Sequence, residues 1–550
     1  MANSKVNSAG LKAAASDLRF QAKVLHEAGI VGPMRPDKAL KIGTTFLRWG
    51  ASPATGVTTA AIHYPHELAI VDERGALTWE RLHRRSNALA HSFAAMGIGP
   101  GDGVGIMCRN HRGFIEATLA SAKLGASALY LNTMFAGPQL AEVTKRESPK
   151  VLIHDEEFGD LLSEVDDSIT RIVGWCDGEV SSPTLDSLIE GGDESNLKPP
   201  PAKPKFVILT SGTTGTPKGA QRSSPEGLLP IAALIDKIPF RSRMTMMIAA
   251  PLFHSWGFFH FVMSLPTAAT MVLRRRFDPE DTLQAIETSR AHVLAAVPVM
   301  IQRILTLPEE TLDKYTLPSL KITSLSGSAL PGELAIAWMD RFGDNVYNLY
   351  GSTEVAYATV ATPEDLRAAP GTAGKPPRGT KICLYDESGA EVPRGEVGRI
   401  FVGNAMAMEG YTGGGGKEML DGLYSSGDVG HIDSNDRLFI DGRDDEMIVS
   451  GGENVFPREV EDLLADHAAV EEVAVIGVED DEFGQRLKAF VVIRSEVEVS
   501  AQDLTAHVKA NLASYKSPRE IEFLDELPRN ATGKVLKKDL RARESAEKSA

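Results

Sequence analysis

The sequence predicts an α/β protein with largely parallel sheets and more than one domain. Short apolar runs typical of buried strands, at residues 103–107 and 151–154, alternate with helical periodicity such as that of 113–124. Alternation of this kind favours parallel sheets covered by helices. The 550 residues exceed what one hydrophobic core usually supports, so at least two domains are expected.

A change of pattern near residues 441–445 predicts the domain boundary. The strand-like segment 437–440 ends there, and a polar connector leads into a compact pattern with helices expected at 455–465 and 501–512 and strands at 473–477 and 489–493. We therefore expect a large N-terminal domain over residues 1–441 and a small α+β C-terminal domain over 442–550.

The composition is that of an ordinary globular protein, with 43% hydrophobic and 24% charged residues. A net charge of −16 argues against a nucleic-acid partner, because phosphate backbones select basic surfaces. The three cysteines, Cys108, Cys176 and Cys383, have no metal-ligand or redox spacing, which favours a reducing cytoplasm. The N-terminus lacks the apolar run of a secretory signal, and no stretch is long enough to span a bilayer.

Two segments bear on membrane contact. Residues 11–30 have partly amphipathic spacing, which we interpret as a packed N-terminal helix rather than a membrane-surface anchor. The run Arg274-Arg275-Arg276 is the candidate patch for transient membrane contact, although a run of charges is more often a solvated face. We expect a cytoplasmic protein that is at most peripheral at a membrane. The sequence predicts no oligomeric state.

The strongest local feature is a Gly/Thr-rich run at residues 210–219 that follows an apolar strand at 206–209. Glycines let backbone N–H groups converge, hydroxyls add donors and a lysine adds a cation, which together suit polyphosphate oxygens. Pro217 precedes the lysine, so the run is not a Walker A loop. The predicted phosphate-binding residues are Thr210, Ser211, Gly212, Thr213, Thr214, Gly215 and Lys218.

With this run the chain resembles the adenylate-forming superfamily of acyl-CoA synthetases, luciferases and peptide-synthetase adenylation domains. Four more signatures follow in the expected order, namely YGSTE at 350–354, YSSGD at 424–428, GRDD at 442–445 and PRNATGK at 528–534. The resemblance runs from about residue 60 onward and is greatest to bacterial fatty-acid–CoA ligases. It implies a large domain of stacked sheets and a small mobile C-terminal domain.

The resemblance implies an acid–thiol ligase that uses ATP, Mg²⁺ and coenzyme A. A carboxylic acid, expected to be a medium- or long-chain fatty acid, would form an acyl-adenylate with release of pyrophosphate. Coenzyme A would then take the acyl group and release AMP. Charge builds on the phosphates in the first step, so Mg²⁺ and preorganised cations should dominate catalysis.

The resemblance also assigns residues to the nucleotide. Glu354 would ligate magnesium, since a hard cation prefers oxygen donors, and Thr353 would contact the α-phosphate. The remaining nucleotide contacts would come from Tyr350 and Gly351 at adenine, Gly327 and Ser328 beside it, and Asp428 and Arg443 at the ribose. Lys534 would bridge the acyl carboxylate and the α-phosphate, while Lys537 and Lys538 are interpreted as solvated helix charges.

The thioester step depends on a second set of residues. Asp445 resembles the hinge about which the small domain rotates, and Ser450, Gly451 and Gly452 would then face the pantetheine thiol. His254 resembles the residue beside the acyl carboxylate. The acyl pocket is expected to include Trp256, Gly257, Phe258 and Val297.

Departures from the signatures are mild. Ser426 stands where threonine is usual, and Asp444 adds a second acid beside Asp445. The alternatives within the superfamily are an aryl-acid–CoA ligase and an acyl-AMP ligase that loads a carrier protein. Outside the enzymes, a nucleotide-binding sensor could share the scaffold, but it would need neither Glu354 nor Lys534.

Overall fold

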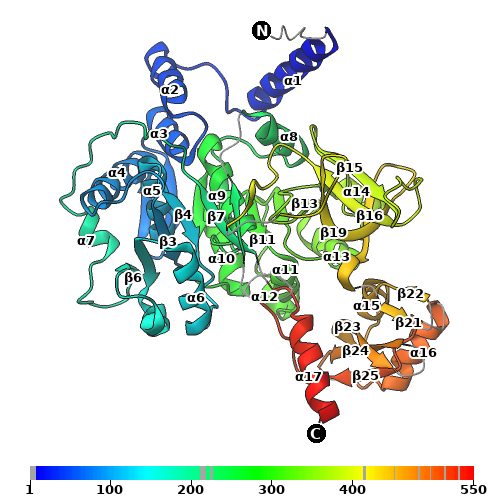
Figure 1. Cartoon of the computed structure of the whole chain (residues 1–550). Coiled ribbons are helices and arrows are strands. Elements are labelled where there is room, and N and C mark those ends of the chain that lie inside the picture. The colour runs from blue at the N-terminus through cyan, green and yellow to red at the C-terminus, as the bar shows by residue number, and fades with distance from the viewer. Residues whose placement is uncertain are drawn as a thin grey trace.

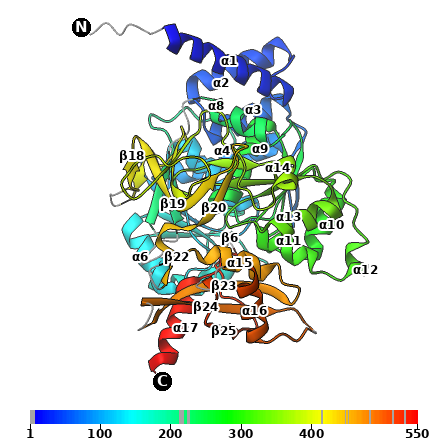
Figure 2. The same ribbon diagram turned by 90° about the vertical axis from the view of Figure 1, so that its right-hand side faces the viewer.

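The computed structural model describes residues 8–210, 218–222, 227–412, 416–446, 448–450, 453–480, 484–495, 497–512, 516–530 and 533–549. Four sheets organise this part of the chain (Figure 1). Two large sheets and a smaller antiparallel one form the N-terminal region, and the fourth belongs to a small C-terminal domain at the lower end of the molecule (Figure 2).

The largest sheet has eight strands and is parallel except at its two edges. In spatial order these are β14 (Thr359–Ala361), β13 (Val346–Tyr350), β12 (Ile322–Leu325), β11 (Val293–Ala296), β9 (Thr245–Ile248), β10 (Thr270–Leu273), β1 (Leu68–Asp72) and β2 (Gly75–Thr78). Helices α8 (Leu229–Lys237), α10 (Pro279–Ser289), α11 (Pro298–Leu305), α12 (Glu309–Leu312), α13 (Gly332–Phe342) and α14 (Pro363–Ala368) connect or flank these strands.

The second sheet has seven strands and is parallel from β6 to β7. Its order is β17 (Gly410–Tyr411), β8 (Lys218–Arg222), β7 (Phe206–Thr210), β4 (Ser127–Tyr130), β3 (Gly103–Met107), β5 (Val151–Asp155) and β6 (Thr170–Trp175). Helices α6 (Gly137–Glu147) and α7 (Leu185–Ile189) and the 3-10 helix η1 (Glu156–Glu164) complete this region.

Helices packed between the two large sheets form the main core. Helix α5 (Arg112–Leu124) is buried along almost its whole length, and one apolar cluster joins it to both sheets. Helices α3 (Pro53–His63), α4 (Trp79–Ala95) and α9 (Ser255–Thr267) contribute to the same cluster. This arrangement brings the carboxyl ends of strands from two sheets near one another, where ligand sites of α/β proteins usually lie.

The third sheet leads to the small domain. It contains β15 (Lys381–Tyr385), β16 (Gly398–Gly403), β19 (Leu423–Ile432), β18 (Met419–Leu420) and β20 (Leu438–Arg443). A 3-10 turn, η2 (Asp444–Glu446), joins β20 to the first strand of the fourth sheet. Strand β20 therefore continues past residue 441, where we expect the boundary, and ends at Arg443.

In the described part of the small domain, helices pack on a mixed sheet. The strands are β22 (Glu453–Val455), β21 (Ile448–Ser450), β24 (Gly484–Ile493), β23 (Val470–Asp480) and β25 (Glu520–Phe523), and the helices are α15 (Pro457–Ala465), α16 (Ala501–Asn511) and α17 (Lys537–Ser549). Its own apolar cluster includes Val460, Val475 and Leu504. The α/β class, with a large N-terminal domain and a small C-terminal one, is thus confirmed.

Two helices at the N-terminus lie at the end of the molecule opposite the small domain (Figures 1 and 2). Helix α1 (Ser8–Glu27) packs on α8, and its Val24 and Leu25 are buried, as expected of a packed helix. Helix α2 (Pro36–Trp49) packs on α3. No helix in the described part of the chain is long and apolar enough to cross a membrane.

Candidate active site

A single cavity of about 980 Å³ joins the N-terminal region to the small domain. Its polar end is lined by predicted nucleotide-binding residues, including Asp428, Arg443 and Lys534. From there it continues past His254 into an apolar channel between α3, α8 and α9, and it reaches Phe46 of α2. The structure therefore brings most of the described candidate site residues to one cavity.

At the polar end, Asp428 is fixed by two neighbours. Asp428 on β19 lies directly opposite Arg443 on β20 in the antiparallel register, and Arg443 Nη1 donates to Asp428 Oδ1 at 3.1 Å. The phenol of Tyr350, at the end of β13, donates to Asp428 Oδ2 at 2.5 Å. Burial, followed by the Asp428 charge, raises the pKa of Tyr350 well above its ordinary value, so the phenol stays protonated as a donor.

Glu354 is held beside the phosphate-loop hairpin. Strands β7 and β8 pair antiparallel, with Thr210 opposite Lys218, so the Gly/Thr-rich run joins two paired strands. Strand β17 pairs with β8, and its Tyr411 donates to Glu354 Oε1 at 2.9 Å. Burial and the Glu354 charge raise the pKa of Tyr411, which keeps this donor protonated.

Part of the predicted phosphate loop lies outside the described residues, namely Ser211, Gly212, Thr213, Thr214 and Gly215. The backbones of Thr210 and Lys218 are described, but their side chains are not. Gly327, Ser328, Gly351 and Thr353 line the cavity wall. A Cβ atom at Gly351 would lie 2.4 Å from the carbonyl oxygen of Ala356, so this turn requires glycine.

Lys534 reaches the cavity on a short loop of the small domain. The Asn530 carboxamide Oδ1 accepts from the Lys534 N–H at 2.9 Å, and the Asn530 N–H donates to the Lys534 carbonyl at 2.9 Å. Gly533, at φ +76°, lies against Val299 of α11, where a Cβ atom would come within 2.2 Å of Val299 Cγ1. The loop thus sits on the wall of the N-terminal domain with Lys534 at the polar end of the cavity.

The predicted hinge and thiol face lie in the connection between the third and fourth sheets. Asp445 is in η2, and its neighbour Asp444 accepts from Arg399 Nε at 2.8 Å. Ser450 ends β21, where it pairs with Glu453. Gly451, Gly452 and the side chains of Asp445 and Ser450 lie outside the described residues.

The apolar end contains three of the four predicted pocket residues, Trp256, Phe258 and Val297. Trp256 donates its indole N–H to the Ala296 carbonyl at 3.0 Å and stacks on Phe259. Gly257 is not on the cavity wall. A Cβ atom there would lie 2.3 Å from the Pro251 carbonyl oxygen, so Gly257 serves the close packing of α9 on the preceding loop.

His254 lies at the junction between the polar and apolar ends, immediately before α9. Its Nε2 atom is buried and has no hydrogen-bond partner among the described residues. Burial lowers the pKa of His254 from 6.5 to about 4, so the imidazole is neutral near pH 7. A neutral imidazole on the cavity wall can donate a hydrogen bond to a ligand oxygen.

Lys417 and Asn348 also line the cavity, and sequence reasoning missed both of them. A Cβ atom at Gly427 would lie 3.2 Å from Lys417 Nζ and 3.2 and 3.3 Å from two guanidinium nitrogens of Arg443. Lys417 makes no ion pair with any described residue, and Asn348 Oδ1 is buried without a partner there. The only sequence signal for Lys417 is its position after four glycines, 413–416.

The expectation that Lys537 is a solvated helix charge is wrong. It is not solvated, because its ammonium pairs with Glu446 at 3.0 Å and with Glu461 at 2.9 Å, and its side chain is only 15% exposed. Burial opposes the charge, but the two carboxylates outweigh burial and raise the pKa of Lys537. The pair to Glu446 ties the start of α17 to the turn that contains Asp445.

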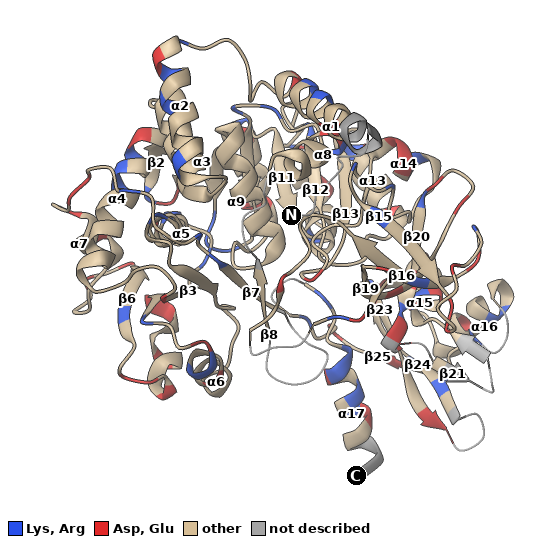
Figure 3. Cartoon of the chain, turned by 45° about the horizontal axis from the view of Figure 1, so that its top comes forward, with Lys and Arg blue, Asp and Glu red and all other residues tan. Residues whose placement is uncertain are grey.

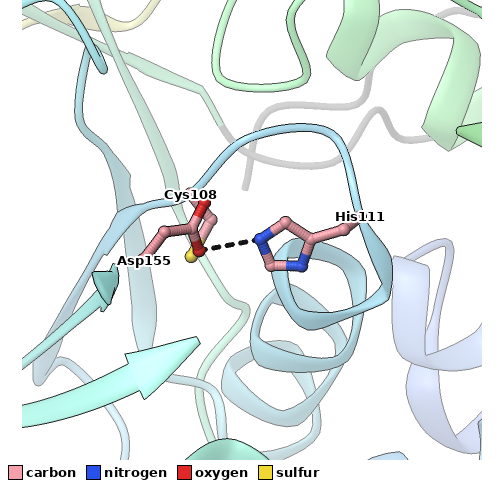
Figure 4. A group of neighbouring side chains, drawn as sticks. All are labelled: Cys108, His111 and Asp155. Carbon is pink, nitrogen blue, oxygen red and sulfur yellow. Dashed lines mark hydrogen bonds and ion pairs between the residues drawn. The ribbon is translucent and has the colours of Figure 1, made fainter. Parts of the chain in front are cut away.

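Cys108, His111 and Asp155 lie close together and are all residue types that can bind a metal (Figure 4). Hydrogen bonds account for this arrangement. His111 Nδ1 accepts from the Gly113 N–H at 3.0 Å, so Nε2 carries the proton and donates to Asp155 Oδ1 at 2.8 Å. Burial and Asp155 raise the pKa of the Cys108 thiol, which keeps it protonated. This buried cluster therefore fastens the start of α5 to strands β3 and β5.

Comparison with known proteins assigns the family. The sequence model of the AMP-binding enzyme family matches residues 57–412, and that of the AMP-binding enzyme C-terminal domain matches residues 459–534. Feruloyl-CoA synthase from an Amycolatopsis species is 33% identical over 87% of this chain and 96% of its own length. The fatty acid–[acyl-carrier-protein] ligase ScoC of Streptomyces coeruleorubidus is 29% identical over 89% of this chain and 96% of its own.

The fold agrees with these relatives. The crystal structure of the anthranilate CoA ligase AuaEII in complex with anthranoyl-AMP superposes with a TM-score of 0.81 at 25% identity, over 89% of this chain and 96% of that one. Family match, relatives and fold therefore coincide over most of the chain. The protein belongs to the AMP-binding enzyme family, among its acyl- and aryl-CoA ligases.

Proposed function

We propose that this protein activates a medium- or long-chain fatty acid with ATP and Mg²⁺ and transfers the acyl group to coenzyme A, releasing pyrophosphate and AMP. One observation carries the proposal. The cavity that holds Lys534 and Asp428 at its polar end continues past His254 into a long apolar channel. A carboxylate at His254 would thus have a nucleotide on one side and room for an alkyl chain on the other.

The channel's length favours an alkyl chain. Residues from every turn of α9 line it, from Ser255 to Pro266, and this stretch spans about 16 Å at 1.5 Å per residue. Ile231 and Leu234 of α8 and Gly56 of α3 line it from other sides. Each methylene buried there contributes about 0.8 kcal/mol, so binding should strengthen as the acid lengthens.

In the first step, a carboxylate oxygen of the acid attacks the α-phosphorus of ATP. The bond to the bridging oxygen breaks, and its electron pair leaves with pyrophosphate. Lys534 neutralises charge between the carboxylate and the α-phosphate, while the neutral His254 ring donates to the carboxylate. Asp428, held by Arg443 and Tyr350, accepts from the ribose hydroxyls, and the loop at 210–218 binds the phosphates.

Glu354 fits a magnesium ion by the chemistry of its donor. It is a half-buried carboxylate on the cavity wall, and it is held by Tyr411 from a strand paired to the phosphate hairpin. When bound, magnesium would neutralise charge on the phosphate oxygens.

In the second step, the thiol of coenzyme A attacks the acyl carbonyl carbon, AMP leaves with the electron pair of the C–O bond, and the thiol proton passes to solvent. We propose that domains 1–441 and 442–550 rotate about Asp445 between the steps, replacing Lys534 by Ser450, Gly451 and Gly452 at the cavity. The 3-10 turn between the third and fourth sheets is the support for this pivot.

The test is pyrophosphate release with acids of graded length, with and without coenzyme A. Release should rise with chain length to an optimum, and thioester should form only when coenzyme A is present. ATP binding without pyrophosphate release for any acid would indicate a nucleotide sensor. Acyl-AMP that accumulates although coenzyme A is present would indicate a ligase that loads a carrier protein.

An aryl acid is the second candidate substrate, favoured by the similarity to feruloyl-CoA synthase and to the anthranilate CoA ligase. The same screen separates the two. If ferulate or anthranilate releases pyrophosphate more efficiently than every fatty acid tested, the fatty-acid assignment is wrong and the aryl-acid assignment replaces it.

A further inference from the structure

Helix α2 presents apolar side chains to solvent at the distal end of the cavity. Leu40 is 70% exposed and Leu47 88% exposed, and no residue of the helix is buried. Leu40, Gly43 and Leu47 are three and four residues apart, so they lie on one face. Ile42, Thr45 and Trp49 are half-buried on the opposite face, which packs on α3.

This exposure is concentrated in one region of the chain. Of the twelve large apolar side chains that are exposed in the described residues, five lie between Leu18 and Leu47. Single exposed apolar residues are common on soluble proteins, whereas a grouped set marks an interaction surface. We call Leu40, Gly43 and Leu47, with the flanking Lys41 and Arg48, the α2 surface.

The charges beside the apolar face are basic, in contrast to the chain as a whole. Residues 35–49 contain Arg35, Lys38, Lys41 and Arg48 but only one acid, Asp37, in a protein of net charge −16 (Figure 3). Asp37 pairs with Arg35. Lys41 and Arg48 are exposed, make no ion pair with any described residue, and follow Leu40 and Leu47 directly in the sequence.

The α2 surface is also continuous with the cavity. Phe46 of α2 lines the channel and is 40% exposed, so α2 forms part of the channel wall. Ala51, Ser52 and Pro53, which follow the helix, line the same cavity. Helix α2 lies at the end of the molecule opposite the small domain (Figure 1).

We propose that the α2 surface docks the enzyme on anionic phospholipid membranes, with Leu40 and Leu47 in the headgroup–acyl boundary and Lys41 and Arg48 on lipid phosphates. An apolar helix face with basic residues at its border has the chemistry of an interfacial membrane helix. A second copy of the chain would present the same positive charges to itself, which opposes self-association through this surface.

The arginine run 274–276 does not provide an alternative surface. Arg274 pairs with Asp281 at 3.1 Å, Arg275 with Asp177 at 3.2 Å and Arg276 with Glu157 at 3.0 Å. With each guanidinium already next to a carboxylate, the run offers little net charge to a membrane. The α2 surface, rather than the arginine run predicted from the sequence, is therefore our candidate for membrane contact.

The test is cosedimentation of the full chain with vesicles of phosphatidylcholine alone and with one-third phosphatidylglycerol. Wild type should bind the anionic vesicles, and Leu40→Gln with Leu47→Gln should weaken binding at least about tenfold. Lys41→Glu with Arg48→Glu should remove the preference for anionic vesicles. Met134→Gln, at another exposed apolar residue, is the matched control and should bind as wild type does.

Three results would overturn the proposal: no binding of wild type to anionic vesicles, equal binding by the Leu40/Leu47 variant, or an α2-dependent dimer by sedimentation velocity. Pyrophosphate release with a short, water-soluble acid should be the same in all variants, which verifies their folding. The proposed function supplies only the reason for membrane docking, and the docking itself does not depend on it. Vesicle binding needs no ATP, so its failure is measured separately from a failure of acid activation.

Discussion

Gly533 lies against Val299, and a Cβ atom on Gly533 would come within 2.2 Å of Val299 Cγ1. The contact joins the lysine loop of the small domain to helix α11 of the N-terminal domain. Since φ at Gly533 is +76°, both the space and the backbone conformation require glycine. Placement of Lys534 at the cavity therefore depends on its neighbour having no side chain.

Gly533→Val should slow pyrophosphate release at least about tenfold, because the added side chain collides with Val299 and keeps the loop off α11. Thioester formation from supplied acyl-adenylate should change little, because the proposed rotation moves the lysine loop away from α11 before that step. The control is Gly395→Val, at another positive-φ glycine, where a Cβ atom would meet no other atom within 4 Å. Loss of both half-reactions in the Gly533 variant alone would contradict this role.

Lys417→Met should weaken AMP binding about 10- to 100-fold, because Lys417 Nζ and the Arg443 guanidinium converge beside Gly427 as two cations facing the cavity. Adenosine binding should stay unchanged, since it carries no phosphate. Isothermal titration of both ligands checks this, with the exposed Lys198→Met as control. Equal weakening of AMP and adenosine would show that Lys417 acts only on local structure.

Val262→Trp should shorten the acyl channel. Val262 is half-buried on α9 and lines the cavity, so a larger ring would fill the space for the distal part of an alkyl chain. The optimum in the pyrophosphate-release screen should move to shorter acids, with each lost methylene contact costing about 0.8 kcal/mol. An unchanged length profile in a folded variant would place the alkyl chain elsewhere.

The stability of the fold should fall between pH 7 and pH 5. His260 is fully buried, and burial lowers its pKa from 6.5 to about 4. The unfolded chain takes up this proton below pH 6.5 while the folded chain does not until about pH 4, so the stabilisation present above pH 6.5 is lost as pH falls. At pH 5 the loss from His260 is about 2 kcal/mol.

Urea unfolding at several pH values measures this loss. His260→Gln should reduce the pH dependence of the unfolding free energy by up to one proton, whatever it does to the absolute stability. His66→Gln, the same substitution at an exposed position, is the control. Identical slopes in wild type and the His260 variant would mean that His260 titrates normally in the folded state.

The sequence predicts those parts of the site whose position follows from local structure. Asp428 and Arg443 are fifteen residues apart, on adjacent antiparallel strands, so their pairing follows from a short-range hairpin. The strands at 103–107 and 151–154 can also be predicted from the sequence, because buried parallel strands consist of short apolar runs.

Features that depend on packing between distant segments escape sequence reasoning. Gly257 is predicted from the sequence to line the pocket. Instead, the Pro251 carbonyl lies so close to it that only glycine can pack there. Lys537 reads as a solvated helix charge, yet Glu446 and Glu461 come from two other elements to neutralise it. The acyl channel is formed by α3, α8 and α9. Its depth depends on how these helices pack together, which no local sequence pattern predicts.

In the proposed mechanism, Lys534 acts on the adenylation of an acid held at His254. The most direct measurement compares wild type with Lys534→Ala in two assays, pyrophosphate release from ATP and fatty acid, and thioester formation from supplied acyl-adenylate and coenzyme A. Lys538→Ala, at an exposed neighbouring lysine, is the control. We predict that Lys534→Ala lowers pyrophosphate release by about 10²- to 10³-fold or more and spares thioester formation. Equal loss in both assays, or no pyrophosphate release by wild type with any carboxylic acid, would show that Lys534 does not have this role.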